Sequence, residues 1–278
     1  MKDDVIVGTK QLRDLKQPIR PNPGEGPCPR DLEIDQIFVN LVIHEGRAKY
    51  DFLEGRCKQP KVFPIPRADQ HDGEICVENI IDGRHKNILV VGCPGIGKTI
   101  LSTKLLRVAA FDALKDGNFD VAFLIKFKRF NSVKNLNLRE LFTGSETVKN
   151  LNDDVWKYII QNPSKVLLIF DGVDEFSAKE DICQDDSGYK DIEEKKMPLQ
   201  CLYYKIASRK LLPGATVITT SRPTAVSCVR QLNFDKIVEF LGFSSEEVAN
   251  YVKKFTEGSN DSVSRETIWQ HRSEEHTS

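Results

Sequence analysis

Four short apolar segments alternate with longer amphipathic segments in the middle of the chain. The apolar segments consist almost entirely of Val, Ile, Leu, Phe, Ala and Thr, and they cover residues 88–91, 121–125, 166–170 and 215–219. Strands that are buried on both faces have this pattern, and such strands belong to parallel sheets covered by helices. The intervening segments 99–114, 151–161 and 199–212 have the spacing and length of helices. The alternation predicts an α/β domain with a doubly wound, mainly parallel sheet flanked by helices.

The segments on either side of this alternation have a different character. Proline and glycine interrupt the N-terminal part, most densely between Pro21 and Pro29, where neither a helix nor a sheet ladder can propagate. Charged and polar residues dominate a stretch before the last predicted helix, which favours a solvated, mobile insertion, with a regulatory contact as the alternative. The predicted organisation is a disordered linker over 1–30, an irregular lead-in subdomain over 31–86, a nucleotide-binding domain over 87–240 with a polar insertion at 177–197, an exit helix over 241–257 and a disordered tail over 258–278.

The clearest chemical signal lies directly after the first predicted strand. Residues 92–99 read Gly-Cys-Pro-Gly-Ile-Gly-Lys-Thr, a complete G-x-x-x-x-G-K-[ST] motif that a random chain of this length would show roughly once in a hundred. Its glycines permit positive φ and close approach, so that backbone N–H groups and the following helix N-terminus can cradle phosphates. Lys98 is expected on the β- and γ-phosphates and the Thr99 hydroxyl on Mg²⁺. The predicted nucleotide-binding residues are Gly92, Cys93, Pro94, Gly95, Ile96, Gly97, Lys98, Thr99 and Ile100.

A second group of chemical residues follows the third predicted strand. Asp171, Asp174 and Glu175 stand at its carboxyl end, which is where open α/β sheets bind ligands. In a Walker B role, Asp171 would hold Mg²⁺ through water, and Asp174 or Glu175 would orient or deprotonate a hydrolytic water. An acidic turn alone is as often a plain exposed loop, but the preceding phosphate-binding motif favours the functional interpretation.

Arg222 follows the fourth predicted strand, after the hydroxyl residues of Thr219-Thr220-Ser221. A strand end beside the phosphate-binding loop suits a sensor of the γ-phosphate, and an arginine there can make a charge-assisted contact that distinguishes ATP from ADP. The plain alternative is a surface arginine at the end of a strand.

The overall composition narrows the possible partners. The chain has 278 residues, with 40 Lys and Arg against 41 Asp and Glu, and this net charge of -1 does not favour nucleic acid or an anionic membrane. Its seven cysteines are scattered without a C-x-x-C pair, so we expect reduced thiols. Neither a run of about 20 apolar residues nor a secretory signal is visible, which predicts a cytoplasmic protein without a membrane span.

Together these motifs resemble the NACHT module of NOD-like receptors. The resemblance rests on the loop 92–99, the extended Walker B sequence 171–175, the sequence Thr-Ser-Arg-Pro at 220–223 and Leu-Gly-Phe-Ser at 241–244, and it is expected to cover about 87–257. Ser244, the last residue of these motifs, and Glu247 are predicted to form a capping box for a helix through Phe255. The resemblance implies a P-loop NTPase that binds ATP or ADP with Mg²⁺, hydrolyses slowly and forms homo-oligomers with ATP in the full-length receptor.

Some alternatives remain open at this point. An N-K-x-D motif is missing, so adenine is the expected base; Arg47, Tyr50 and the pair Ile80-Ile81 either line its pocket or simply pack. The other two function classes are a P-loop turnover enzyme, such as a kinase or motor, and a weakly binding interaction fragment that does not hydrolyse. The helical, winged-helix and repeat domains of such receptors do not follow, and residues 272–278 resemble a translated sequencing adapter, which suggests a fragment.

Overall fold

The computed structural model describes residues 42–45, 76–115, 119–148, 150–182, 194–242, 247 and 250. The chain divides into two compact units, and the helices and strands whose bounds are given below all belong to the unit that contains Val42–Gly242. Of the second unit, Lys16–Leu41 and Phe243–Ser278, the structure describes Glu247 and Asn250, both helical. The predicted linker 1–30 and tail 258–278 lie outside the described residues, as does most of the predicted exit helix.

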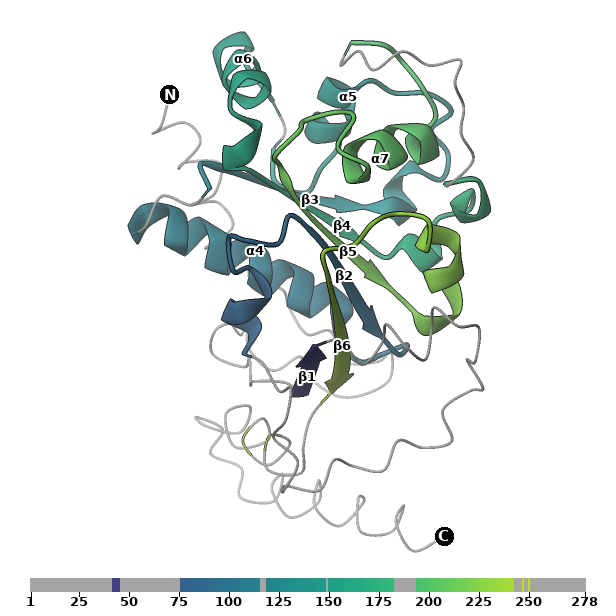
Figure 1. Cartoon of the computed structure of the whole chain (residues 1–278). Coiled ribbons are helices and arrows are strands. Elements are labelled where there is room, and N and C mark those ends of the chain that lie inside the picture. Colours follow the sequence, from purple (N-terminus) through teal and green to yellow (C-terminus); the bar gives the residue numbers. More distant parts are fainter. Residues whose placement is uncertain are drawn as a thin grey trace, which may run out of the picture. The chain divides into compact units, whose positions relative to one another are not determined.

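A six-stranded sheet forms the centre of the first unit, in the order β1-β6-β2-β5-β4-β3 (Figure 1). The five strands from β6 to β3 are parallel, and β1 pairs antiparallel with β6 at one edge. Both the parallel pairing and the almost complete burial of the central strands agree with the predicted mainly parallel sheet. The strands are β1 (Val42–Glu45), β2 (Asn87–Gly92), β3 (Val121–Lys126), β4 (Val166–Asp171), β5 (Thr216–Ser221) and β6 (Lys236–Gly242).

Helices cover both faces of the sheet, which confirms the doubly wound architecture. The long helix α4 (Lys98–Lys115) packs against β3 and β4 on one face, and α5 and α7 lie on the opposite face (Figure 1). Residues of α5 (Leu138–Thr143), α6 (Asp153–Gln161) and α7 (Leu199–Ala207) share one hydrophobic core with alternate residues of the strands. Short 3₁₀ helices complete the described part: η1 (Val77–Ile80), η2 (Phe127–Phe130), η3 (Pro163–Lys165), η4 (Val173–Glu175), η5 (Lys179–Asp181) and η6 (Pro223–Val229).

Capping explains where two of these helices begin. The Asn137 side chain accepts a hydrogen bond from the backbone N–H of Glu140, whose own side chain accepts one from the Asn137 N–H, which makes a capping box before α5. Asn152 caps α6 in a simpler way, through the N–H of Val155. The predicted helix 199–212 is too long, because α7 ends at Ala207 and both Arg209 and Leu212 have positive φ.

The pattern of apolar residues did not predict two strands, β1 and β6. β6 begins with Lys236 and contains Glu239, and both charged residues are buried, at 5% and 6% exposure. The Lys236 ammonium donates to the carbonyl oxygen of Asn79 at 2.8 Å, which makes its burial tolerable. β1 belongs to the predicted lead-in, so that segment contributes an edge strand to the sheet.

The described residues of the predicted polar insertion 177–197 include two buried apolar positions and several exposed ones, namely Ser177, Glu180, Glu194 and Lys196. Ile182 and Met197 are completely buried, and Met197 forms a β-bridge with Leu136 in which each N–H donates to the other's carbonyl. Apolar side chains therefore attach the segment to the core at these two positions. Residues 183–193 lie outside the described part of the chain.

Candidate functional site: a nucleotide site at the carboxyl ends of β2, β4 and β5

The glycine-rich loop between β2 and α4 has the backbone geometry that a phosphate cradle requires. Gly95 and Gly97 have φ values of 75° and 99°, which residues with a side chain rarely adopt. A Cβ atom on Gly92 would lie 3.0 Å from Ile96 Cγ2 and 3.2 Å from Phe240 Cβ, so a larger residue at this position would crowd both side chains. The loop then passes directly into α4, whose first turn is closed by a hydrogen bond from Leu101 N–H to the Gly97 carbonyl at 2.9 Å.

Lys98 folds back onto this loop. Its ammonium donates to the carbonyl oxygens of Gly92 at 2.8 Å and Cys93 at 2.9 Å. Burial lowers the pKa of Lys98 below its ordinary value; the charge of Asp174 opposes this shift, whereas that of Arg222 adds to it. A polyanion in the loop would supply the negative charge that favours the protonated lysine.

The remaining predicted loop residues lie at the surface of this cradle. Thr99 and Ile100 occupy the first turn of α4 and are exposed, Ile100 to 44%. Pro94 and Gly95 are also exposed, while Cys93, Ile96 and Gly97 are half-buried. The nine predicted residues therefore lie together in one loop and helix start, and four of them, Pro94, Gly95, Thr99 and Ile100, are exposed.

Asp171, the last residue of β4, is buried to 6% exposure and is held by two hydroxyl groups. Its Oδ1 accepts hydrogen bonds from Ser102 Oγ at 2.9 Å and from Thr220 Oγ1 at 2.8 Å. Sequence reasoning missed both hydroxyl residues. Ser102 lies one helical turn after Thr99 on α4 and is followed directly by two more polar residues, so no signal in the sequence singles it out.

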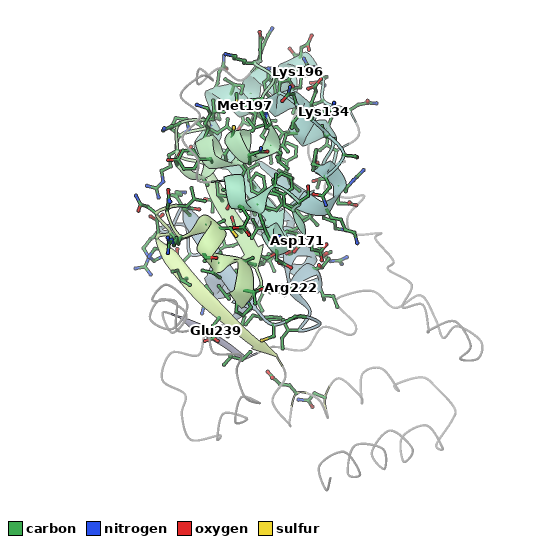
Figure 2. All side chains as sticks on the ribbon, turned by 90° about the vertical axis from the view of Figure 1, so that its right-hand side faces the viewer. Lys134, Asp171, Lys196, Met197, Arg222 and Glu239 are labelled. Atoms are coloured by element: carbon green, nitrogen blue, oxygen red, sulfur yellow. The ribbon has the colours of Figure 1, made fainter. Side chains whose placement is uncertain are left out.

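Asp174 and Arg222 form an ion pair near Asp171 (Figure 2). Arg222 Nε lies 2.7 Å from Asp174 Oδ2, and the Arg222 backbone N–H donates to Oδ1 at 3.1 Å. The Asp174 side chain is only 7% exposed, whereas that of Arg222 is 41% exposed. Both oxygens of Asp174 are therefore engaged by one residue, whose guanidinium still reaches the surface.

Glu175 is exposed and sits in a turn that Asn131 holds in place. The Asn131 side chain donates to the Glu175 carbonyl at 3.0 Å and accepts from the Ser177 N–H at 2.9 Å. Asn131 comes from the chain after β3, and the sequence pattern gave no reason to select it. Its two bonds fix the backbone on both sides of Phe176.

Aromatic side chains of the hydrophobic core pack next to the acidic turn 171–175. The Phe127 ring lies 5.6 Å from that of Phe170 and 5.3 Å from that of Phe176, and Tyr203 of α7 packs edge-on against both Phe127 and Phe170. Phe170 and Phe176 flank Asp171 in sequence, so their packing in the core fixes the strand end that carries the carboxylate.

The strand order explains why the two halves meet. β5 lies between β2 and β4, so Thr220 and Arg222 stand between the glycine-rich loop and the acidic turn. Figure 2 shows Asp171 and Arg222 close together, away from Lys134, Lys196 and Met197. Positive-φ glycines, an ammonium, a carboxylate and an arginine at one edge fit a nucleotide with Mg²⁺ in their residue types and backbone geometry.

Two further predictions concern the lead-in and the membrane. Ile80 is fully buried and η1 packs against α4, which favours packing over a base-pocket role, while Arg47 and Tyr50 lie outside the described residues. Within the described part of the chain, the helices are too short or too polar to cross a bilayer.

A parallel sheet with a phosphate-binding loop after one strand and a held carboxylate at the end of another defines a P-loop NTPase domain. The chain belongs to the NACHT domain family, whose model matches residues 86–259, more than half of the sequence. The resemblance to the nucleotide-binding modules of NOD-like receptors, expected over about 87–257, is thereby confirmed.

Several curated relatives share this region. Protein NLRC5 of Ictalurus punctatus is 28% identical over 217 residues, which are 71% of this chain and 12% of that relative. Protein NLRC5 of Homo sapiens is 28% identical over 227 residues, 79% of this chain and 11% of that relative. "NACHT, LRR and PYD domains-containing protein 3" of Homo sapiens is 30% identical over 174 residues, which are 60% of this chain and 16% of that relative. This chain thus spans 11 to 16% of the length of these relatives.

Proposed function

We propose that this domain is an ATP/ADP-dependent molecular switch with slow, Mg²⁺-dependent ATP hydrolysis. In this proposal it is the nucleotide-binding core of a cytoplasmic receptor in innate-immune or cell-death signalling, and its output is homo-oligomeric assembly with ATP rather than a released product. The observation that carries the proposal is the convergence of the Lys98 loop, Asp171 and the Asp174–Arg222 pair at one sheet edge. The similarity to NLRC5 and to NACHT, LRR and PYD domains-containing protein 3 supports the receptor context.

Each binding residue has a role that its chemistry supports. The Lys98 ammonium exchanges the loop carbonyls for the β- and γ-phosphates, which are stronger acceptors because they are charged. The Thr99 hydroxyl and Asp171 hold Mg²⁺, the aspartate through water. When bound, the ion neutralises phosphate charge and makes the terminal phosphorus more electrophilic.

The Asp174–Arg222 pair suits a sensor of the terminal phosphate. Arg222 is half-exposed and already oriented by Asp174, so a γ-phosphate competes with the aspartate for the same guanidinium. ADP lacks that group and leaves the ion pair intact. Arg222 would in this way convert the presence of one phosphate into a rearranged ion pair at the end of β5.

Glu175 is better placed than Asp174 to orient or deprotonate a hydrolytic water. Its side chain is exposed, whereas both Asp174 oxygens are engaged by Arg222. A general base needs an oxygen within reach of water. Asp174 then acts on the reaction through Arg222.

The deciding experiment compares Lys98→Ala with Lys134→Ala, an exposed lysine away from this edge. We expect the wild type and Lys134→Ala to retain adenine nucleotide through purification, and Lys98→Ala to lose it, with an affinity about 100-fold weaker. Stoichiometric ADP on purified Lys98→Ala would refute the assignment of Lys98.

The other two function classes give distinct results in the same preparation. Turnover that rises steeply on adding nucleic acid or a phosphoacceptor would indicate a motor or kinase. Absence of equilibrium binding of labelled ATP to the wild type would indicate an interaction domain without nucleotide.

A further inference from the structure

Ser102 is a buried hydroxyl whose best partner is the Asp171 carboxylate. It is completely buried on α4, one turn after Thr99, and its Oγ lies 2.9 Å from Asp171 Oδ1 and 3.1 Å from the Lys98 carbonyl. A serine has one hydroxyl proton, and the bond to a charged carboxylate is the stronger of the two. The hydroxyl therefore connects the helix that starts at the phosphate loop with the carboxylate at the end of β4.

Thr220 supplies the second hydroxyl, and its proton direction is fixed by its surroundings. The Gly172 backbone N–H donates to Thr220 Oγ1 at 2.8 Å, and Oγ1 lies 2.8 Å from Asp171 Oδ1. Because a lone pair of Oγ1 accepts from Gly172, the hydroxyl proton is available for Asp171. Thr220 is completely buried, so water does not compete for these bonds.

Both hydrogen bonds from the described residues to this carboxylate end on the same oxygen, Oδ1. Two donors on one oxygen fix the carboxylate plane and leave Oδ2 available to another ligand. We propose that Ser102 and Thr220 are positioning residues for Mg²⁺: they hold Asp171 so that its second oxygen is available to the hydrated ion. This inference rests on the proposed nucleotide function and extends it to Ser102, which lies outside the motifs, and to Thr220, whose motif had a predicted role only through Arg222.

A purely structural role for Ser102 makes a different prediction. Serine in a helix often bonds to the carbonyl four residues earlier, and Thr103 does so with the Thr99 carbonyl at 2.9 Å. Thr103 is also buried, at 4% exposure, and neighbours Ser102 on α4. It therefore offers a control variant with the same helix chemistry.

The test measures the affinity of the full 278-residue chain for the fluorescent nucleotide mant-ADP as Mg²⁺ is titrated, with EDTA as the metal-free reference. For Ser102→Ala we expect unchanged affinity in EDTA and about a tenfold rise in the Mg²⁺ concentration needed for half of the metal effect, because one charge-assisted bond is lost. Thr103→Ala should match the wild type in both quantities. Mn²⁺ binding in the presence of ADP, measured by electron paramagnetic resonance, should weaken in Ser102→Ala and stay unchanged in Thr103→Ala.

Thr220 provides a second pair of variants in case Ser102→Ala does not fold. Thr220→Val keeps the side-chain shape but removes the hydroxyl, so it should raise the Mg²⁺ requirement about tenfold. Thr220→Ser keeps the hydroxyl and should behave as the wild type.

The outcomes separate this inference from the proposed function. An unchanged Mg²⁺ requirement in folded Ser102→Ala or Thr220→Val, with normal Mg²⁺-dependent binding by the wild type, would overturn the positioning role alone. An equal loss of affinity with and without Mg²⁺ would also overturn it. If the wild type binds no nucleotide, both proposals fail together.

Discussion

The two halves of the candidate site are built in different ways. The loop from Gly92 to Thr99 is shaped by its backbone, with positive φ at Gly95 and Gly97, and the ammonium of Lys98 donates to two carbonyl oxygens of the same loop. The ends of β4 and β5 are made of side chains: Asp171 is buried among hydroxyls, and Asp174 is buried against Arg222. A backbone site is specified by local sequence, whereas a side-chain site is specified by which strands become neighbours.

This difference assigns distinct tasks to the halves. If the loop binds nucleotide as proposed, substitutions in it should change the affinity for ATP and ADP alike, because the cradle would contact phosphates that both share. Substitutions at the strand ends should change how the domain responds to metal or to the third phosphate. Three experiments can break or sharpen this division.

The largest effect is expected for Gly97→Ala. A φ of 99° is unfavourable for alanine, so the loop must change shape, and affinity for ATP and ADP should fall together by about 10- to 100-fold, measured by calorimetry. Gly214→Ala is the matched control, because Gly214 has φ of 98° and precedes β5, outside the loop. It should lower the melting temperature without changing nucleotide affinity; equal losses of affinity in both variants would contradict the division.

An intermediate effect is expected when the Asp174–Arg222 pair is broken. Arg222→Ala removes a charge-assisted contact, so the ratio of ATP to ADP affinity should fall about tenfold. Asp174→Asn weakens the competitor for the guanidinium and should raise the same ratio by a few-fold. Arg129→Ala, which breaks the exposed Arg129–Glu146 pair at 2.9 Å, should leave the ratio unchanged. A shift of the same sign in both site variants would disprove the competition between aspartate and phosphate.

The smallest effect concerns protons. Burial lowers the pKa of free Lys98, and bound phosphates would raise it again, so binding takes up a fraction of a proton in the pH window between the two values. As pH rises through the lowered pKa, affinity should fall. Calorimetry in buffers of different ionisation enthalpy, well above the phosphate pKa of about 6, measures this uptake.

Lys98→Arg is the control for this titration. The guanidinium stays charged above pH 12, so binding by this variant should take up no proton. Proton uptake that persists in Lys98→Arg would assign the titration to another group.

The difference between the loop and the strand ends also explains which features the sequence predicted. The four strands β2 to β5 and the positive-φ glycines of the loop were predicted correctly, because each depends on neighbours in the chain. Ser102, Thr220 and Asn131 were not selected, since their importance depends on packing α4 against β4, pairing β4 with β5 and placing two loops together. β6 was missed because Lys236 and Glu239 interrupt its apolar pattern, although the fold buries both. The roles of the site residues stay predictions until nucleotide binding is measured.

The position of β5 also sets a distance. Adjacent strands lie about 4.8 Å apart, so the ends of β2 and β4 are separated by about 9.6 Å, two strand spacings. Ser102 is the side chain that connects the helix after β2 with the carboxylate after β4. A movement of α4 by about 1 Å away from Asp171 in the direction of that 2.9 Å contact would stretch it beyond hydrogen-bond length. The Ser102–Asp171 hydrogen bond therefore depends on the position of α4 relative to the end of β4.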